Sequence, residues 1–313
     1  MTALCCANSG SLQALILDRT APKGNLYDSP SSAERWQKAY QEKDILRLRK
    51  EVPVGIISLH LRNNNPQRVV FLGSGDGIDE ARLFGQMRIN VPVVLLDRSK
   101  NLLTVAHQFF CGEFPATAVT GIQGNFYELN QCYRQWNNRY IGTCTYLMMG
   151  NTFANIEEEK LLTSLTSVAK PGDQFAFSVP VSMVNDPADI EDIRRNDGRM
   201  RSGELVPKGT YYDFFASAYD SREEVQDLQL YHHPIPFSSE EGSKCSIPGS
   251  YAVEIRSRYN KNGEPQDDSV IVLRRYTIPS LKKWIEDKGW EVTGKCSYHF
   301  GTHPMCFLVC KKK

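Results

Sequence analysis

The chain has 313 residues, enough for one large domain or two small ones with a sizeable buried core. Its 37 lysines and arginines nearly balance its 36 aspartates and glutamates, which gives a formal charge of +1. This balance argues against bulk nucleic-acid binding or membrane-surface attraction as the main function. Because no apolar stretch reaches membrane-spanning length and the N-terminus does not resemble a signal peptide, we expect a cytoplasmic protein with neither a nucleic-acid nor a membrane partner.

The cysteines and the small basic clusters predict little chemistry of their own. Nine cysteines are scattered without C-x-x-C spacing, and several lie in apolar runs, including Cys144, Cys306 and Cys310. This pattern is typical of buried thiols in a reducing compartment and gives no reason to expect a metal site. The cluster of Arg47, Arg49 and Lys50 is predicted to be a solvated face.

Helical periodicity begins at residue 31 and continues to residue 62. Trp36 with Tyr40, and Ile45 with Leu48, form apolar pairs four and three residues apart. Pro53 ends one helix, and VGIISLHLR is predicted to form a second. We therefore expect residues 1–65 to form an N-terminal helical cover.

The stretch QRVVFLGSGDGIDEARLF organises the rest of the chain. An apolar strand, residues 69–72, leads into three alternate glycines, Gly73, Gly75 and Gly77, and then into a helix. Glycines let the backbone turn sharply and let a ligand lie directly against it, while the helix start offers unpaired N–H groups. The G-x-G-x-G spacing lacks the second half of a dinucleotide fingerprint, and no lysine follows, which excludes a Walker phosphate loop.

A second apolar strand, VPVVLLD, ends in Asp97, where an acid is placed to accept hydrogen bonds from a ribose diol. We predict a nucleoside-binding half-domain from this succession of strand, glycine loop, helix, strand and acid. The glycine spacing is similar to that of class I S-adenosylmethionine (SAM) methyltransferases. The alternative is a plain strand-to-helix turn with a solvated aspartate.

Further candidates follow the next two strands. Asn125 and Phe126 come directly after a strand near residues 118–122, where an amide and a ring suit the edge and face of an adenine. A turn asparagine and a core phenylalanine are the alternative. Gly150 and Asn151 follow the fourth strand, at the carboxyl edge where open α/β sheets bind ligands.

The C-terminal half departs from this repeating pattern. We expect residues 66–183 to form the cofactor-binding core and residues 184–276 to form an inserted substrate or lid region. Within the insertion, HHPIPFSSEEGSKCSIPG is predicted to be a loop, and SYAVEIRSRY with SVIVLRRYT to be a β-hairpin. Residues 277–313 are predicted to complete the core with a last helix and an antiparallel strand pair.

The order of motifs resembles a particular family. FLGSGDG, VVLLD, GNFYEL, MMGNTFANIEEEKLL and GDQFAFSV fall in the order found in the histidine Nα-methyltransferase of ergothioneine biosynthesis and its relatives. The resemblance implies a Rossmann-like class I methyltransferase sheet of seven strands, the last antiparallel, with SAM as the cofactor. It implies that Gly73, Ser74 and Gly75 line the methionine part, that Asp97 holds the ribose, that Asn125 and Phe126 hold the adenine, and that Gly150 and Asn151 lie beside the sulfonium.

The substrate end departs from that family. Arg275 and Tyr276 match its Lys-Tyr pair, but Ile271 and Leu273 stand where its enzymes carry the Glu and Ser that bind imidazole. Histidine is therefore not the expected substrate, and we expect methyl transfer to another small molecule, at an amine or amino-acid nitrogen. Transfer to an oxygen or to a protein side chain, and a non-catalytic SAM-binding module, remain alternatives.

Aromatic hydroxyls are the candidate catalytic groups. Tyr40, Tyr211 and Tyr212 could orient an amine or surround a methylammonium by cation–π contact, as could Tyr219 and Tyr276. The alternative for each is a tyrosine of the core or its rim.

Overall fold

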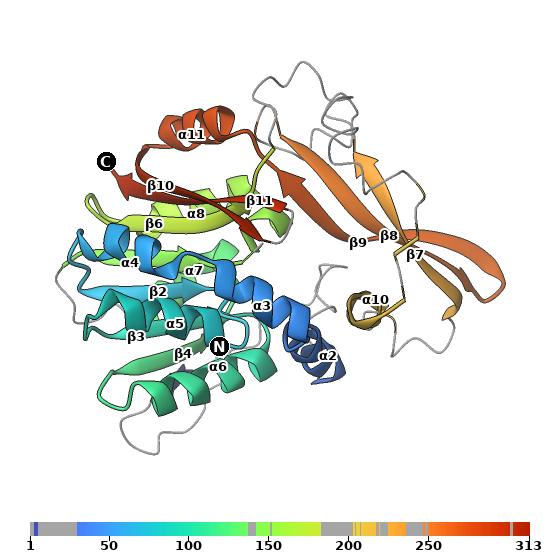
Figure 1. The fold of residues 1–313 in the computed structure, drawn as a ribbon, viewed down its shortest axis with the longest axis horizontal. Coiled ribbons are helices and arrows are strands. Elements are labelled where there is room, and N and C mark those ends of the chain that lie inside the picture. Colours follow the sequence, from blue (N-terminus) through green and yellow to red (C-terminus); the bar gives the residue numbers. More distant parts are fainter. Residues whose placement is uncertain are drawn as a thin grey trace.

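The protein has a large sheet flanked by helices and a smaller sheet that extends from one end of it (Figure 1). The computed structural model describes residues 3–5, 30–136, 142–150, 152–182, 203, 205–206, 208–216, 219, 225–235, 247, 250–300 and 303–313. The strands of the large sheet are β1 (Ala3–Cys5), β2 (Arg68–Leu72), β3 (Val93–Asp97), β4 (Val119–Gln123), β5 (Cys144–Met148), β6 (Gln174–Pro180), β10 (Trp290–Phe300) and β11 (His303–Lys312).

The order of the large sheet is β1-β4-β3-β2-β5-β6-β11-β10. The strands from β4 to β6 run parallel, and β11 lies antiparallel between β6 and β10. The order reverses between β2 and β5, and such a switch point is where open α/β sheets bind ligands. The predicted Rossmann-like sheet of seven strands is confirmed; the short β1, paired with β4 at one edge, is an eighth strand that was not predicted.

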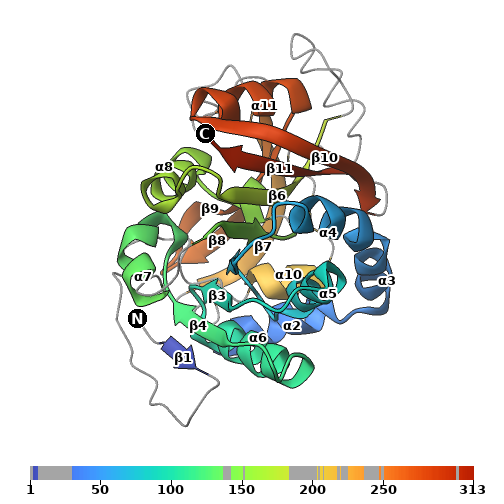
Figure 2. The same ribbon diagram turned by 90° about the vertical axis from the view of Figure 1, so that its left-hand side faces the viewer.

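Helices cover both faces of this sheet (Figure 2). One face carries α4 (Val54–Arg62), α5 (Ile78–Met87) and α6 (Lys100–Glu113), and the other carries α7 (Leu129–Trp136), α8 (Glu158–Val168) and α11 (Ile278–Asp287). Because the central strands are covered on both sides, β2 and β3 are apolar along nearly their whole length and every residue in them is buried. Phe71 and Phe110 belong to the core of the first face, and Phe153 and Phe177 to the core of the second.

The N-terminal helical stretch divides differently from the prediction. Residues 30–62 form three helices, α2 (Pro30–Tyr40), α3 (Lys43–Glu51) and α4, instead of two. The additional break falls at Gln41 and Glu42, and the predicted break at Pro53 is confirmed. The short 3-10 turns η2 (Phe126–Glu128) and η3 (Thr152–Asn155) follow β4 and β5.

The small sheet consists of β7 (Val225–Ile235), β8 (Tyr251–Lys261) and β9 (Glu264–Arg275), all antiparallel. The predicted hairpin is confirmed, and its two turn residues, Asn262 and Gly263, have φ of 52° and 86°, as a type I′ turn requires. The prediction of a loop is wrong for its first residues, HHPI, because they belong to β7 and pair with β8. They are the end of β7, which is an outer strand of this sheet, and outer strands tolerate proline.

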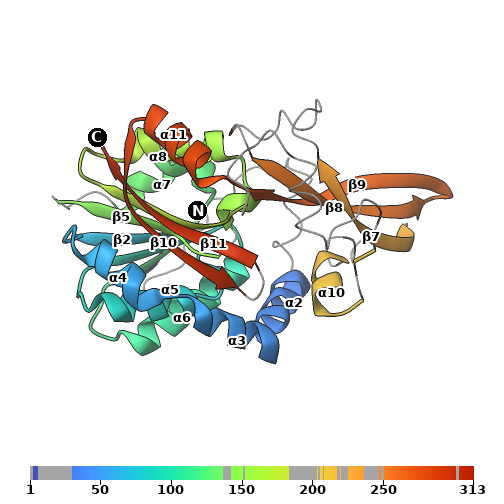
Figure 3. The same cartoon turned by 45° about the horizontal axis from the view of Figure 1, so that its top comes forward.

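The small sheet is attached at the carboxyl edge of the large one. Directly after β9, Tyr276 forms a parallel bridge with Val181, and its carbonyl accepts a hydrogen bond of 2.8 Å from the Ser182 N–H. Helix α10 (Thr210–Ala216) packs on α2, beside the small sheet (Figure 3). The small sheet therefore lies next to the carboxyl ends of the strands at the switch point.

Candidate functional site

The glycine loop after β2 is a tight turn held by backbone hydrogen bonds. Gly73, Gly75 and Gly77 have φ of 72°, 53° and 78°. The N–H of Gly73 donates to the Leu96 carbonyl at 2.8 Å, and that of Gly77 donates to the Ser74 carbonyl at 2.9 Å. The loop thus joins the end of β2 to the end of β3 before α5 begins.

Asp97, at the end of β3, lies against this loop. It is 8% exposed, and its carboxylate accepts hydrogen bonds from the N–H of Gly75 at 2.9 Å and of Ser99 at 2.8 Å. The structure therefore brings two of the predicted sites together, with Asp97 as an anchor of the loop.

Asn125 and Phe126 lie on the neighbouring turn after β4. The Asn125 side-chain oxygen accepts a hydrogen bond of 3.0 Å from the Tyr127 N–H and caps the 3-10 turn. The half-buried Phe126 ring comes within 3.9 Å of the position that a Cβ on Gly73 would take. Asn125 thus caps the turn through its side-chain oxygen, and the Phe126 ring lies beside the glycine loop; their adenine roles stay predictions.

The turn after β5 completes this edge. Gly150 has φ of 65°, and its carbonyl accepts a hydrogen bond from the Ser178 hydroxyl on β6. Thr152, two residues further on, lies 3.2 Å from a Cβ built on Gly73. Asn151 falls outside the described residues.

Helix α2 covers the glycine loop. The Trp36 ring lies 2.8 Å from the position of a Cβ on Gly75, and it stacks on Tyr40 with ring centroids 4.1 Å apart. Trp36 also packs against the apolar cluster of the small sheet, which includes Phe215. This one side chain therefore contacts both the loop and the inserted region.

Arg49 on α3 makes a second contact with the start of α5. Its guanidinium forms ion pairs with Asp76 at 3.3 Å and Asp79 at 2.9 Å, and it lies 5.4 Å from the Tyr40 ring centroid. Burial lowers the Arg49 pKa, but the two aspartates outweigh it and the pKa is raised. Burial raises the pKa of Glu80 well above its ordinary value, and the charges of Asp79 and Asp76 raise it further.

The prediction that Arg49 belongs to a solvated basic face is wrong, since the residue is only 5% exposed. The sequence did contain a sign of this burial. Arg49 is four residues from the apolar Ile45, which is buried, and positions four apart share one face of a helix. Trp36 was recognised only as part of an apolar pair. Neither residue was predicted to belong to the site.

The candidate catalytic tyrosines lie on two helices. Tyr40 is on α2, stacked on Trp36 above the loop. Tyr211 and Tyr212 are on α10; the Tyr212 hydroxyl donates to the Leu228 carbonyl at 2.8 Å, which ties α10 to β7. The Tyr211 side chain lies outside the described residues. Catalytic roles for all three stay predictions.

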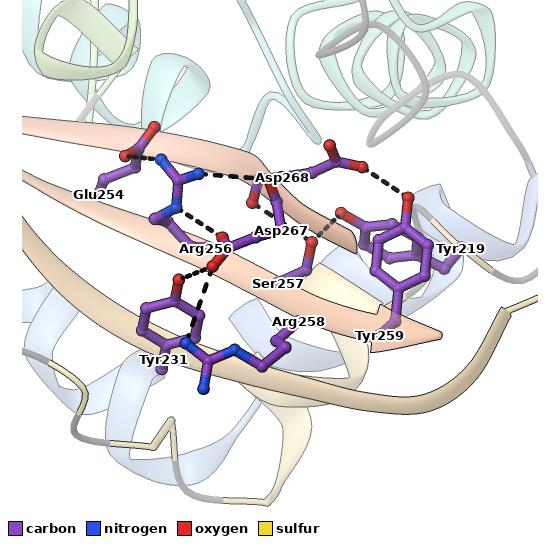
Figure 4. A network of polar contacts seen from close by, with 9 residues as sticks. All are labelled: Tyr219, Tyr231, Glu254, Arg256, Ser257, Arg258, Tyr259, Asp267 and Asp268. Atoms are coloured by element: carbon purple, nitrogen blue, oxygen red, sulfur yellow. Dashed lines mark hydrogen bonds and ion pairs between the residues drawn. The ribbon is translucent and has the colours of Figure 1, made fainter. Parts of the chain in front are cut away.

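The small sheet carries polar contacts on both of its faces (Figure 4). On one face, Arg256 pairs with Glu254 at 3.0 Å and with Asp267 at 2.7 Å, and Tyr231 also donates to Asp267. Burial would raise the pKa of Asp267, but the hydrogen bonds from Tyr231 and Arg256 lower it. These groups satisfy one another and tie the three strands together.

On the opposite face of the same sheet, the Tyr219 hydroxyl contacts Ser257, and Tyr259 donates to Asp268 at 2.6 Å. This face also holds Ile255 and Tyr259 in the apolar cluster. It is the face that packs toward α10 and Trp36.

A buried polar cluster joins the end of β9 to the start of α8. The Tyr276 hydroxyl donates to Glu158 Oε1 at 2.6 Å, and Arg274 Nε lies 3.3 Å from the same oxygen. Glu158 is 1% exposed and Tyr276 is fully buried. Ile271 is buried in the apolar cluster and Leu273 packs against it, so these two positions contribute no polar group there.

Further observations concern membrane spans, metal sites and cysteines. Within the part that the structure describes, no helix is long and apolar enough to cross a membrane, and no group of three or more His, Cys, Asp or Glu could hold a metal ion. Cys306 and Cys310 are free and buried as predicted, Cys144 is free and half-buried, and Cys111 is disulfide-bonded, which was not predicted.

No family model matches this chain. No curated protein matches it either.

Solved structures of similar fold include the following methyltransferases. One is an S-adenosylmethionine-dependent methyltransferase from Clostridium acetobutylicum, 12% identical, with a TM-score of 0.50 over 89% of this chain and 98% of that one. Another is the magnesium protoporphyrin IX methyltransferase of Synechocystis with S-adenosylhomocysteine bound, 12% identical, with a TM-score of 0.50 over 94% and 100% of the two chains. A structure of the same enzyme with SAM bound is 11% identical, with a TM-score of 0.50 over 96% and 100%.

At such identities the likeness shows the fold. The chain has the Rossmann-like fold of class I methyltransferases, with an additional edge strand and a three-stranded sheet attached at the carboxyl edge. Neither of these two proteins is named as a histidine methyltransferase, so the resemblance to that family stays a prediction.

Proposed function

We propose that this protein is a SAM-dependent methyltransferase whose acceptor is a small molecule that offers an amine or amino-acid nitrogen. The observation that supports it most directly is the glycine loop anchored by Asp97 at the switch point of a methyltransferase-fold sheet. The SAM-bound structure of the same fold supports the choice of cofactor.

The residues at this edge fit the cofactor. The Ser74 hydroxyl is buried on the loop without a hydrogen-bond partner, and the Phe126 ring lies beside Gly73, where it can stack on an adenine. In this proposal Gly73 to Gly75 line the methionine part, and Asp97 accepts from the ribose diol. Asn125 and Phe126 hold the adenine, and Gly150 with Asn151 lies beside the sulfonium.

The bound cofactor supplies an electrophilic methyl group on a sulfonium, so the protein needs to position the acceptor and exclude water more than to move protons. Trp36 and the apolar cluster of the small sheet supply a water-excluding wall at this edge. The preference for an amine follows from the family resemblance and from the aromatic candidates near the cover, because aromatic faces attract ammonium groups. Tyr40, Tyr211 and Tyr212 would orient that acceptor.

The first experiment is calorimetric titration of the purified protein with S-adenosylhomocysteine, with a nicotinamide dinucleotide as the control. Binding of the homocysteine compound alone supports the proposal. It would justify a screen of amines and amino acids with methyl-labelled SAM, in which labelled product identifies the acceptor. Binding of neither compound, also with candidate acceptors present, would contradict the proposal.

The ribose contact has a matched control within the same sheet. Asp97→Ala is expected to weaken S-adenosylhomocysteine binding by ~1.5–3 kcal/mol, the value of a charge-assisted hydrogen bond. Asp173 is equally buried, 3% exposed, and accepts from the N–H groups of Cys144 and Lys170 at the opposite edge. Asp173→Ala should lower the stability of the protein and leave its affinity for S-adenosylhomocysteine unchanged. Unchanged affinity in Asp97→Ala would reject the ribose contact.

A further inference from the structure

Three buried polar atoms around the glycine loop have no hydrogen-bond partner. They are Arg49 Nη1, Ser74 Oγ and Asp76 Oδ2, in residues that are 5%, 1% and 3% exposed. Buried donors and acceptors are almost always satisfied in native proteins, since an unsatisfied one forfeits its hydration. Two of these atoms on one turn and a third on the adjoining α3 fit a polar ligand at that place.

The three atoms belong to one small region. Ser74 and Asp76 lie on the same turn, which the hydrogen bond from the Gly77 N–H to the Ser74 carbonyl closes at 2.9 Å. Arg49 joins them from α3, with Nη2 3.3 Å from Asp76 Oδ1. Asp76 Oδ1 also accepts from the Ile78 N–H at 3.2 Å, so the unpartnered oxygen is the other one.

The chemistry of the three atoms identifies the ligand group. A guanidinium N–H and a hydroxyl donate to a carboxylate, whereas a carboxylate oxygen accepts from an ammonium. A ligand with only a carboxylate would leave Asp76 Oδ2 without a donor, and a ligand with only an ammonium would leave Arg49 Nη1 without an acceptor. A group that carries both charges on neighbouring atoms satisfies all three, and an α-amino acid is such a group.

We propose that Arg49, Ser74 and Asp76 bind the amino-acid end of the cofactor, with Arg49 and Ser74 on its carboxylate and Asp76 on its ammonium. This inference rests on the proposed function, because it places SAM at the glycine loop. It assigns to the helical cover a direct part in cofactor binding, through Arg49 of α3.

The test compares two ligands by calorimetry. S-adenosylhomocysteine carries the amino-acid end, and 5′-methylthioadenosine retains the adenosine and the sulfur without it. Arg49→Lys keeps a positive charge for Asp79, but it has one nitrogen where arginine has three. It should weaken S-adenosylhomocysteine binding by about tenfold or more, as the loss of a hydrogen bond between charged groups predicts, and leave 5′-methylthioadenosine binding unchanged.

Two further variants separate binding from folding. Ser74→Ala removes one donor and leaves the ion pairs in place. It should weaken the binding of S-adenosylhomocysteine by about threefold to tenfold and leave the binding of 5′-methylthioadenosine unchanged. Arg82→Met is the matched control, because Arg82 donates to the carbonyls of Arg49 and Lys50 and so fixes α3 by another route. It should keep the wild-type ratio of the two affinities.

The outcomes are distinct. Selective loss of S-adenosylhomocysteine affinity in Arg49→Lys and Ser74→Ala supports the inference. Equal losses for both ligands, or no loss for either, would overturn it while leaving the cofactor site in place. If wild-type protein binds neither ligand, the proposed function fails first and the inference fails with it.

Discussion

A methyl group added at Gly77 tests whether α5 and α6 pack as closely as the structure places them. The new Cβ would lie 2.9 Å from both Cα and Cβ of Ala106 on α6, a separation that real Cβ atoms essentially never show. The residue also has φ of 78°, which side chains other than glycine rarely adopt. The backbone strain costs ~1–2 kcal/mol and overpacking against a helix backbone ~1–3 kcal/mol, so Gly77→Ala should destabilise by about 2–5 kcal/mol.

Two other glycines calibrate this value. Gly75 has φ of 53°, but a Cβ there meets the edge of the Trp36 ring, a side chain on the cover that can move more easily than a backbone. Gly75→Ala should therefore cost about 1–3 kcal/mol. Gly85, within α5, has only an ordinary contact of 3.5 Å to Phe114, and Gly85→Ala should gain ~0.5–1 kcal/mol.

Urea unfolding followed by circular dichroism measures all three free energies on one scale. The expected order of stability is Gly85→Ala, wild type, Gly75→Ala and Gly77→Ala, from the most to the least stable. A Gly77→Ala protein as stable as wild type would refute the reasoning, because α6 would then have yielded at no cost.

Three further predictions concern buried groups. Tyr276→Phe removes the 2.6 Å hydrogen bond to the buried Glu158 carboxylate and should cost ~1.5–3 kcal/mol in urea unfolding, whereas equal stability would show that the hydroxyl is dispensable. The raised pKa of Glu80 means that the folded state binds its proton more tightly than the unfolded state does. The contribution of this group to the free energy of unfolding is therefore complete below the unfolded pKa of about 4.5, and it is lost as the pH rises through the folded pKa. Wild type should therefore lose stability relative to Glu80→Gln as the pH rises above 4.5, and a difference that stays constant with pH would contradict the assignment. Burial raises the pKa of the Cys132 thiol to about 11, so Cys132 should react with iodoacetamide at pH 8 only after unfolding; mass spectrometry that finds it labelled in native protein would contradict its burial.

The parts of the site that the sequence predicted are those that depend on neighbouring residues in the chain. The strand, the alternate glycines and the helix start lie within one short stretch, and Asp97 is recognisable because it ends an apolar strand. Parallel strands then bring these ends to one edge without any further information. This is why the loop, Asp97 and Phe126 lie together in the structure as expected.

The parts that the sequence did not predict depend on contacts between distant segments. Arg49 carries the same charge as its neighbours Arg47 and Lys50, and only its ion pairs with Asp76 and Asp79 distinguish it. Strand β7 contains polar residues and a proline, and only its pairing with β8 makes it a strand. Local propensity is a weak guide for such residues, because tertiary contacts decide their environment.

The contacts of Trp36 indicate where acceptor specificity should be sought. Its ring touches the glycine loop on one side and the apolar cluster of the small sheet on the other. The face of that sheet with Glu254 and Arg256 has its charges paired within the sheet, whereas the face with Ile255 and Tyr259 packs toward α10 and Trp36. In the proposed methyl transfer, an acceptor within about 3 Å of a methyl group held at the loop would lie on the side of the second face. If the proposed function is right, substitutions on that face change which acceptor is methylated, while those on the first face change only stability.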